Sequence, residues 1–306
     1  MKHEHNPLAM SPTTWGMLIL LSLVWGGTFF FQEIAVRELP VLTIVAIRVV
    51  LAAMFLSALL ISMGDRLPKD WQIWRALFVL AIINNIIPFC LIVWGQREIA
   101  SGLASILNAA TPMCTVLVAH FLTRDEKNTY AKLIGVLAGF VGVAILMGVD
   151  LLGGLGTTVT AQFAVLGAAF AYSFGAIFGR KFHSMGLTAT GTATGQFIAS
   201  SIILVPVALA VDAPWSLKTP SIAAVGALIC LGSVSTALAY WLYFRILERA
   251  GATNLVLATF LIPVSAVLLG FFILNEILLM RHVVGMIFIG AGLVAIDGRL
   301  LPMRLR

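Results

Sequence analysis

Charged residues are scarce in this chain of 306 residues: they make up 10% of it, whereas 60% of the residues are hydrophobic. A soluble protein of this length needs about a quarter of its residues charged to cover its surface. A soluble globular fold is therefore excluded, and much of the outer surface is expected to face lipid. The longest polar interruptions, near residues 149–160 and 212–220, are too short to form an additional soluble domain.

Cysteines and metal-binding motifs are also scarce. The three cysteines, Cys90, Cys114 and Cys230, all lie in apolar runs, which predicts small buried side chains and no disulfide framework. Neither C-x-x-C nor H-E-x-x-H occurs in the chain. The sequence therefore gives no reason to expect a metal or another cofactor.

Apolar segments of membrane-spanning length account for most of the chain. A helix needs about 20 apolar residues to cross a bilayer. Such segments lie near residues 14–32, 40–63, 72–94, 99–122, 129–148, 161–179, 187–211, 220–244, 251–274 and 282–298. The first is too long for the core of a signal peptide and no A-x-A-like site follows it, so we expect a retained helix that Ser11 and Pro12 begin. The predicted fold class is an all-α membrane protein with ten transmembrane helices.

Lysine and arginine are distributed unevenly between the loops at the two membrane faces. About fourteen lie on the face that holds the N-terminus, and about four lie on the other. Because positive residues are retained in the cytoplasm, both termini are predicted to be cytoplasmic in a multi-pass protein of a bacterial-type inner membrane. The net charge of +6 then follows from this topology and indicates no nucleic-acid partner.

Two stretches of the chain resemble each other at an offset near 150 residues. Aligning Ala100–Met147 with Gly251–Ile296 pairs Pro112 with Pro263, Glu126 with Glu276, Gly135 with Gly285, and Gly142 with Gly292. A repeat of five helices is odd in number, so the second copy enters the membrane from the opposite side. We therefore expect two inverted-topology five-helix repeats, a symmetry that suits alternating access.

The domain organisation follows from this repeat. A cytoplasmic N-terminal segment is expected at residues 1–13, the first five-helix repeat at 14–148, a periplasmic linker at 149–160, the second five-helix repeat at 161–298, and a cytoplasmic C-terminal tail at 299–306.

Several motifs together resemble the drug/metabolite transporter superfamily, in particular its EamA-like members. They are Trp25-Gly26-Gly27 in the first helix, the fourth-helix run from Ala100-Ser101 to Pro112, Glu126 before a glycine-rich helix, and the matching Pro263, Glu276 and Gly285. The resemblance implies ten helices in two inverted halves around a central cavity, lined mainly by the first, third and fourth helices of each half. It also implies transport of amino acids and other small metabolites, often outward, with aromatic amino acids among the exported solutes.

Polar and aromatic side chains inside apolar helices are candidates for the cavity wall, because lipid-facing positions rarely hold them. The predicted substrate-binding residues are Trp25, Asn84, Asn85, Ser105, Asn108, Tyr172, Ser235, Tyr240, Trp241 and Thr259, and the predicted hinges are Pro112 and Pro263. The structural alternatives are helix–helix hydrogen bonds, core packing and static kinks. The residue types indicate a neutral, aromatic-lined site for amino-acid-sized solutes.

Arg48 is the only charged residue well inside a predicted helix. A charge at that depth must pair or face water. Glu33 and Glu38 are the nearest candidate partners in sequence; the alternatives are snorkelling to the interface and binding of a substrate carboxylate. No acidic residue lies at mid-membrane depth, which favours facilitated over proton-coupled transport.

The function predicted from these observations is an inner-membrane transporter that exports amino acids, including aromatic and neutral ones, and related metabolites. The expected partners are a small-molecule substrate and the lipid bilayer, and a monomer is expected. A nucleotide-sugar or drug transporter of the same fold is the alternative, although nucleotide sugars call for several cavity cations. An integral membrane enzyme or a channel is a more distant alternative, since no nucleophile–base pair is evident.

Overall fold

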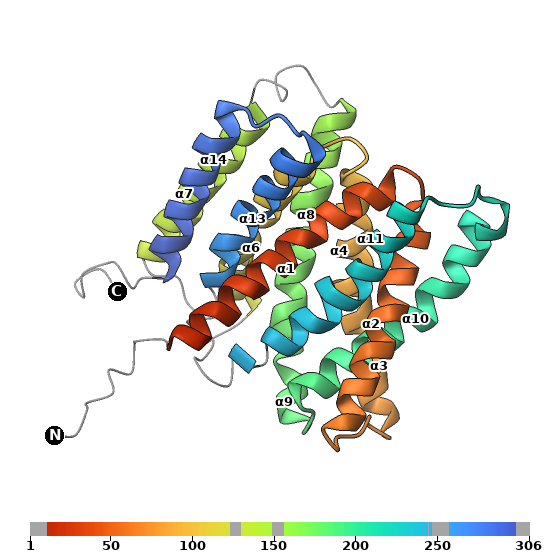
Figure 1. Cartoon of the computed structure of the whole chain (residues 1–306). Coiled ribbons are helices and arrows are strands. Elements are labelled where there is room, and N and C mark those ends of the chain that lie inside the picture. The colour runs from red at the N-terminus through yellow and green to blue at the C-terminus, as the bar shows by residue number, and fades with distance from the viewer. Residues whose placement is uncertain (1–10, 123–129, 149–155, 244, 247–256, 298–306) are drawn as a thin grey trace.

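The computed structural model describes residues 11–122, 130–148, 156–243, 245–246 and 257–297, and all the regular elements in these ranges are helices (Figure 1). The α-helices are α1 (Pro12–Val36), α2 (Val41–Ser62), α3 (Trp71–Ala81), α4 (Ile87–Gly95), α5 (Ser101–Asn108), α6 (Thr111–Leu122), α7 (Tyr130–Met147), α8 (Thr157–Gly179), α9 (Lys181–Ser184), α10 (Ala189–Asp212), α11 (Ile222–Gly232), α13 (Leu257–Leu274) and α14 (Met280–Asp297). Two π-helical segments, η1 (Ile82–Ile86) and η4 (Ser233–Leu238), and one 3₁₀ turn, η3 (Pro214–Ser216), complete them.

Each of the ten predicted segments overlaps one of these helices or a short run of them. Within the described residues, seven helices are long and apolar enough to cross a membrane, and three further apolar helices are shorter. Two helix starts precede the predicted starts of the repeats: α1 begins at Pro12, two residues before residue 14, and α8 begins at Thr157, four residues before residue 161. Glu126 and most of the predicted linker lie outside the described residues, as do residues 1–10 and 298–306.

Several helices begin at a short polar side chain that caps them, as Ser11 and Pro12 predict for α1. Ser11 Oγ accepts a hydrogen bond from the Thr14 N–H at 3.2 Å, and Pro12 occupies the first turn. Asp70 and Ser221 cap α3 and α11 in the same way. The first N–H groups of a helix have no partner within the helix, so these oxygens satisfy donors that would be costly to leave unpaired near a membrane.

The third helix of each predicted half contains a π-helical segment at its centre. In the first half, η1 joins α3 to α4 and carries Asn84 and Asn85; in the second, η4 follows α11 and carries Ser235 and Thr236. Thr236 Oγ1 donates to the carbonyl of Leu231, five residues earlier, at 2.8 Å. Widened turns of this kind place extra polar groups on one side of a helix and are frequent at functional sites.

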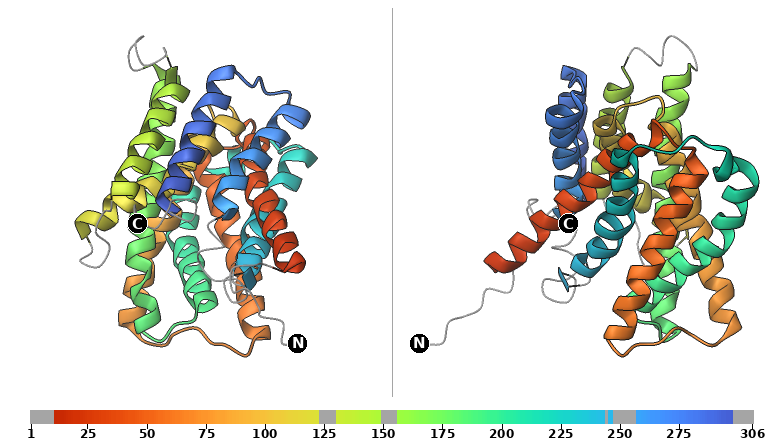
Figure 2. Two further views of the ribbon diagram at one scale, coloured as in Figure 1. Left: turned by 90° about the vertical axis from the view of Figure 1, so that its left-hand side faces the viewer. Right: turned by 45° about the vertical axis from the view of Figure 1, so that its right-hand side comes forward.

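The helices pack as pairs that run in opposite directions. Figure 1 shows α7 and α14 side by side at one edge of the molecule and α2, α3 and α10 at the other, and the views in Figure 2 agree. The α2–α10 pair exchanges contacts at both ends. Asp212, which ends α10, accepts hydrogen bonds from the N–H and hydroxyl of Thr43 at 2.7 and 2.8 Å, and Asp65, beyond the end of α2, accepts one from Thr188, the cap of α10, at 2.5 Å. Each carboxylate thus lies at the positive N-terminal end of the other helix.

The first helix of each predicted half packs against the third and fourth helices of the other half. α1 contacts α11 and α13, and α8 contacts α4 and α6. These contacts bring six helices together at the centre of the molecule.

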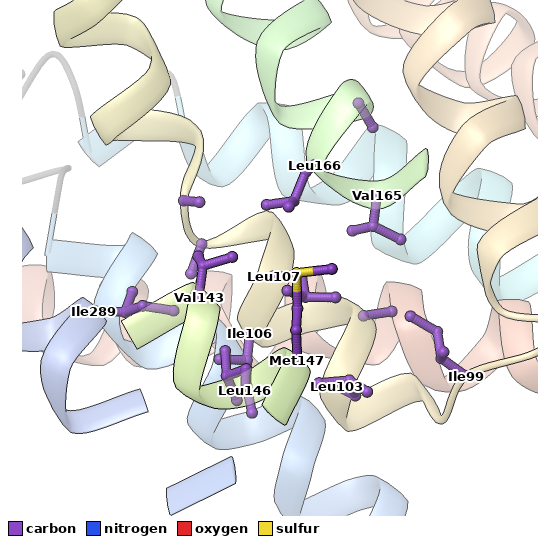
Figure 3. Close-up of a cluster of buried hydrophobic side chains, with 14 of the residues drawn as sticks. Ile99, Leu103, Ile106, Leu107, Val143, Leu146, Met147, Val165, Leu166 and Ile289 are labelled. Carbon is purple, nitrogen blue, oxygen red and sulfur yellow. The ribbon is translucent and has the colours of Figure 1, made fainter. Parts of the chain in front are cut away.

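A packed apolar core lies beside this centre, between α5, α7, α8 and α14. Ile106, Leu107 and Leu146 are essentially inaccessible there, and Val165 and Ile289 close the cluster from α8 and α14 (Figure 3). Close packing of this kind makes a stiff body. The core therefore supports one wall of the cavity described next.

Candidate functional site

A cavity of about 250 Å³ lies where the six central helices meet. It is lined by Trp25, Thr28, Phe29 and Gln32 of α1, Arg48 of α2, Asn84 of η1, Phe89 and Ile92 of α4, Ser105, Asn108, Ala109, Thr111 and Pro112 of α5, α6 and their junction, Tyr172 of α8, Ser235, Thr236 and Tyr240 of the helix that runs to Tyr243, and Thr259, Ile262 and Pro263 of α13. None of these lining residues is Asp, Glu, His or Cys. The wall comes from the helices that the family resemblance implied, with α2 as an addition.

Most of the sequence-predicted site residues face this one cavity. Those that line it are Trp25, Asn84, Ser105, Asn108, Tyr172, Ser235, Tyr240 and Thr259, together with both predicted hinges, Pro112 and Pro263. Their placement brings together residues from both halves of the sequence. Their roles in binding and hinging remain predictions.

The structure does not bring Asn85 and Trp241 of that set to the cavity wall. Asn85 is fully buried and its Nδ2 donates to Ser200 Oγ of α10 at 3.0 Å, so it joins two helices. Trp241 is 37% exposed, and the Arg245 guanidinium lies 5.4 Å from its ring centroid. Successive residues of a helix point about 100° apart, so the neighbours of Asn84 and Tyr240 face elsewhere.

Aromatic rings form a continuous chain along one side of the cavity. The ring centroids of Phe89 and Tyr172 are 6.4 Å apart, and Phe197 lies 6.4 Å from Phe89 and 5.6 Å from Tyr240. Edge-to-face and tilted contacts at these distances favour fixed ring orientations. Tyr243 and Trp25 continue the chain at the other end.

A chain of amides holds the hydroxyl of Tyr240. Asn84 Nδ2 donates to Gln196 Oε1 at 3.4 Å, and Gln196 Nε2 donates to the Tyr240 hydroxyl at 3.3 Å. Gln196 belongs to α10 and is 3% exposed. Gln196 was not predicted from the sequence. It contacts the lining residues Asn84 and Tyr240 without lining the central cavity itself, and no sequence pattern marks such a position.

Four lining side chains have buried polar atoms with no hydrogen-bond partner. They are Thr28 Oγ1, both amide atoms of Gln32, Asn108 Oδ1 and Ser235 Oγ. Sequence reasoning missed Thr28 and Gln32, although a glutamine inside an apolar helix was a signal of the same kind as Asn108. Buried polar atoms without partners are costly in a folded protein. Four such side chains around one cavity mark it as a place where a polar solute can bind.

Arg48 does not pair with either of the carboxylates predicted for it. Glu33 instead binds Arg37, its neighbour one turn away in α1, at 3.2 Å. Glu38 accepts hydrogen bonds from the N–H and hydroxyl of Ser221 at 2.7 and 2.6 Å. Both acids lie near the end of α1, where Arg37 binds Glu33 and the N-terminus of α11 binds Glu38, whereas Arg48 faces the cavity.

The two predicted hinge prolines have different surroundings. The fourth helix is interrupted just before Pro112, because α5 ends at Asn108 and α6 begins at Thr111. Thr111 Oγ1 donates to the carbonyl of Asn108 across this break at 2.6 Å. Pro263 instead lies within the continuous helix α13.

A second cavity of about 420 Å³ adjoins the first and shares Trp25, Asn84 and Tyr240 with it. It continues between α3, α8, α10 and the end of the helix that runs to Tyr243. Its far wall includes two exposed residues, Arg180 just before α9 and His183 within α9. The central cavity therefore leads towards the end of the molecule that holds α9.

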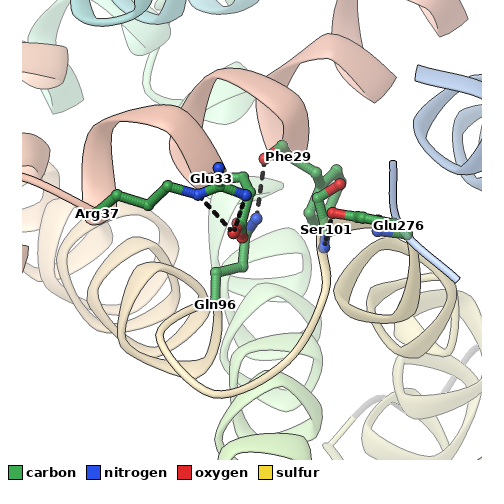
Figure 4. A network of polar contacts seen from close by, with 7 residues as sticks. Phe29, Glu33, Arg37, Gln96, Ser101 and Glu276 are labelled. Atoms are coloured by element: carbon green, nitrogen blue, oxygen red, sulfur yellow. Dashed lines mark hydrogen bonds and ion pairs between the residues drawn. The ribbon is translucent and has the colours of Figure 1, made fainter. Parts of the chain in front are cut away.

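Polar contacts join helices at the opposite end, one of them between the two halves and one within the first half (Figure 4). Glu276, in the connection between α13 and α14, accepts hydrogen bonds from the N–H groups of Ser101 and Gly102 at 2.8 and 3.0 Å, so it caps α5. Gln96 Nε2 donates to the carbonyl of Phe29 at 2.8 Å. These contacts hold the helices together at the end of the cavity that lies away from α9.

Comparison with known proteins agrees with this geometry. Residues 14–148 and 159–296 each match the EamA-like transporter family. The chain belongs to this family. Relatives in three organisms match it over most of their lengths. The uncharacterized transporter YoaV of Bacillus subtilis is 20% identical over 90% of this chain and 94% of its own. An uncharacterized transporter of Archaeoglobus fulgidus is 27% identical over 89% and 94% of the two chains.

The third relative and a solved structure extend the comparison. The uncharacterized inner membrane transporter YedA of Escherichia coli K12 is 26% identical over 83% of this chain and 81% of its own. A solved crystal structure with 18% identity superposes with a TM-score of 0.68 over 97% of this chain and 100% of the other, which establishes a shared fold. This EamA-like chain is therefore a multi-pass membrane protein of a transporter family.

Proposed function

We propose that this EamA-like protein is an inner-membrane carrier that exports amino acids, including neutral and aromatic ones, and related small metabolites by alternating access. The observation that carries the proposal is the central cavity: amides, hydroxyls and rings from both halves of the chain surround it, and four of the side chains offer unpartnered polar atoms. Such atoms suit the ammonium and carboxylate of an amino acid, and the rings suit its side chain.

The proposal includes ten spans arranged as two inverted halves, a symmetry that suits alternating access. The antiparallel α2–α10 pair, whose ends exchange carboxylate contacts, supports this arrangement. So do the matching π-helical segments η1 and η4, which border the cavity from opposite halves. Inverted halves place a site at their interface near the membrane midplane, where the polar lining of η1 and η4 lies.

The proposal places both termini in the cytoplasm, and this orientation determines to which side of the membrane the cavity opens. With that orientation, the second cavity leads to the cytoplasm and the contacts of Glu276 and Gln96 close the outer side. The structure then corresponds to an inward-facing state, which is the state in which an exporter loads its solute.

A nucleotide-sugar carrier of the same fold is not favoured by the lining. Phosphates are usually held by several Arg or Lys side chains. Arg48 is the one cationic side chain among the lining residues. A site of this composition suits a solute with one negative group.

Counterflow in proteoliposomes tests the proposal, with phenylalanine and threonine as solutes. We expect saturable exchange of both, and an affinity lowered roughly 2–13-fold in Asn84→Ala, the equivalent of about 0.5–1.5 kcal/mol for one lost hydrogen bond. Tyr240→Leu should weaken phenylalanine more than threonine. Asn85→Ala and Trp241→Leu are adjacent control variants outside the wall and should leave both affinities unchanged. Absence of saturable amino-acid exchange by the unmodified protein would overturn the substrate class.

A further inference from the structure

Arg48 is a buried cation without an anionic partner. Its side chain is 6% exposed, and an arginine stays charged in proteins. Its Nε donates to Thr236 Oγ1 at 3.2 Å. Its terminal nitrogens make no hydrogen bond or ion pair with any residue in the described ranges.

The surroundings of Arg48 leave the edge of its guanidinium for a ligand. The Cζ atom lies 3.7 Å from the centroid of the Phe89 ring, so the ring covers one face of the planar group. Thr236 holds the Nε position. What remains is the pair of terminal nitrogens on a residue that lines the cavity. A carboxylate fits such a pair of donors with two parallel hydrogen bonds.

The rest of the wall supplies no competing anion. The lining residues include no Asp or Glu. Removing a charge from water is costly unless an opposite charge meets it, so a negative solute group is favoured beside Arg48. The cavity also holds acceptors for the opposite end of a zwitterion, because Gln32 Oε1 and Asn108 Oδ1 are buried and unpartnered.

We propose that Arg48 is the carboxylate anchor of the central cavity, and that its ligands are therefore restricted to solutes with a free carboxylate. The inference rests on the proposed carrier function and narrows its substrate class. Thr236 and Phe89 are positioning residues in this arrangement, because they hold the guanidinium and do not supply the charge.

Binding of four ligands that share one aromatic ring tests the inference. Phenylalanine carries both charged groups, phenylalaninamide and phenethylamine carry only the ammonium, and 3-phenylpropionate carries only the carboxylate. Affinities are measured on the purified full-length protein by calorimetry. We expect the two carboxylates to bind roughly 10- to 100-fold more tightly than the amide and the amine, the range for charge-assisted hydrogen bonds.

The variants separate an anchoring role from a structural one. In Arg48→Gln the preference for phenylalanine over phenylalaninamide should collapse, whereas a purely structural defect would weaken both ligands equally and keep the ratio. Arg48→Lys keeps the charge and loses the paired donors, so it should retain part of the preference. Arg66→Gln, an exposed change of the same charge, is the matched control and should change neither affinity.

The outcomes distinguish this inference from the carrier proposal. Equal binding of acid and amide by the unmodified protein overturns the carboxylate anchor and leaves amino-acid-sized transport standing. Binding of 3-phenylpropionate without phenylalanine keeps the anchor and overturns the amino-acid assignment. Binding of none of the four overturns both. The ligand series on the unmodified protein decides the question even where Arg48→Gln fails to fold.

Discussion

Gly135 of α7 approaches α14 so closely that a Cβ atom added to it would lie 2.6 Å from the Gly292 carbonyl oxygen. Two turns further along α7, a Cβ on Gly142 would lie 2.7 Å from the Gly285 carbonyl oxygen of α14. The order of these contacts shows that the two helices run antiparallel. In the sequence alignment Gly135 corresponds to Gly285 and Gly142 to Gly292, so each contact pairs non-equivalent members of the aligned stretches.

Alanine at these glycines should destabilise the protein. We expect Gly135→Ala and Gly292→Ala each to lower the free energy of unfolding by about 1–3 kcal/mol, because the added methyl group overpacks a backbone contact. The matched control is Gly290→Ala on the same helix, where a Cβ meets nothing within 4 Å. That change should be neutral or stabilising by up to about 1 kcal/mol. Unfolding in detergent measures all three, and equal effects at Gly290 and Gly292 would contradict the packing argument.

Much of the fold could be predicted from the sequence because lipid imposes a simple rule on helix length and composition. The apolar runs, the caps and the paired glycines each left a local signal. Which side of a helix faces the cavity was harder to predict: Asn84 lines the cavity, whereas Asn85 contacts Ser200 of α10. The π-helical turn η1 changes the angular phase there, and one sequence gives no sign of such a turn.

The prediction that Glu33 or Glu38 pairs with Arg48 was wrong for a different reason. Closeness in sequence favoured Glu33 and Glu38, but Glu38 reaches the N-terminus of α11, 183 residues away. Pairing across the two halves depends on how they pack, and no local pattern records it. The same limit explains why Gln196 was missed.

Cysteine labelling tests the proposed orientation. Gly156 is exposed, its φ of −71° accepts any side chain, and a Cβ there meets nothing within 4 Å. Ser184 of α9 is exposed at the other end. In a background in which the three native cysteines are changed to alanine, an impermeant maleimide on intact cells should label Gly156→Cys and should reach Ser184→Cys only after lysis. The reverse pattern would invert the topology, and with it the direction of loading.

The contact of Glu38 with Ser221 should make stability pH-dependent. Hydrogen bonds from the hydroxyl and backbone N–H of Ser221 lower the pKa of Glu38 below its ordinary value of 4.5. A carboxyl whose pKa is depressed in the folded state stabilises it above the unfolded-state pKa, and the contribution is lost as the pH falls through the folded-state pKa. The stability difference between the unmodified protein and Glu38→Gln should thus be constant near neutral pH and shrink below about pH 4.5.

Denaturation at a series of pH values measures this difference. The control is the same comparison in a Ser221→Ala background, where the side-chain hydrogen bond is absent and the pH-dependent part should be smaller. A difference between the unmodified protein and Glu38→Gln that stays constant down to pH ~3 would show that the contact does not favour the charged carboxylate.

Three buried glutamines separate binding from stability. Gln32 lines the cavity, is 0% exposed, and has no partner for either amide atom. Gln162 of α8 is equally buried and unpartnered but does not line the cavity. Gln96 is 2% exposed, and its Nε2 donates to the Phe29 carbonyl at 2.8 Å. The same substitution therefore removes an unpaired amide at the cavity wall from Gln32, an unpaired amide away from the cavity from Gln162, and a hydrogen bond to the Phe29 carbonyl from Gln96.

Leucine at Gln32 should stabilise the protein and impair transport. Removing unpaired buried polar atoms relieves a cost of about 1–3 kcal/mol, and residues kept for function at the expense of stability behave in this way. Gln162→Leu should stabilise by a similar amount with unchanged counterflow, because its amide does not face the solute. Gln96→Leu should instead destabilise by about 0.5–1.5 kcal/mol, since the Phe29 carbonyl loses its donor. Unfolding in detergent and phenylalanine counterflow on the same three preparations decide the matter: if Gln32→Leu transports as well as Gln162→Leu, the amide of Gln32 does not take part in binding.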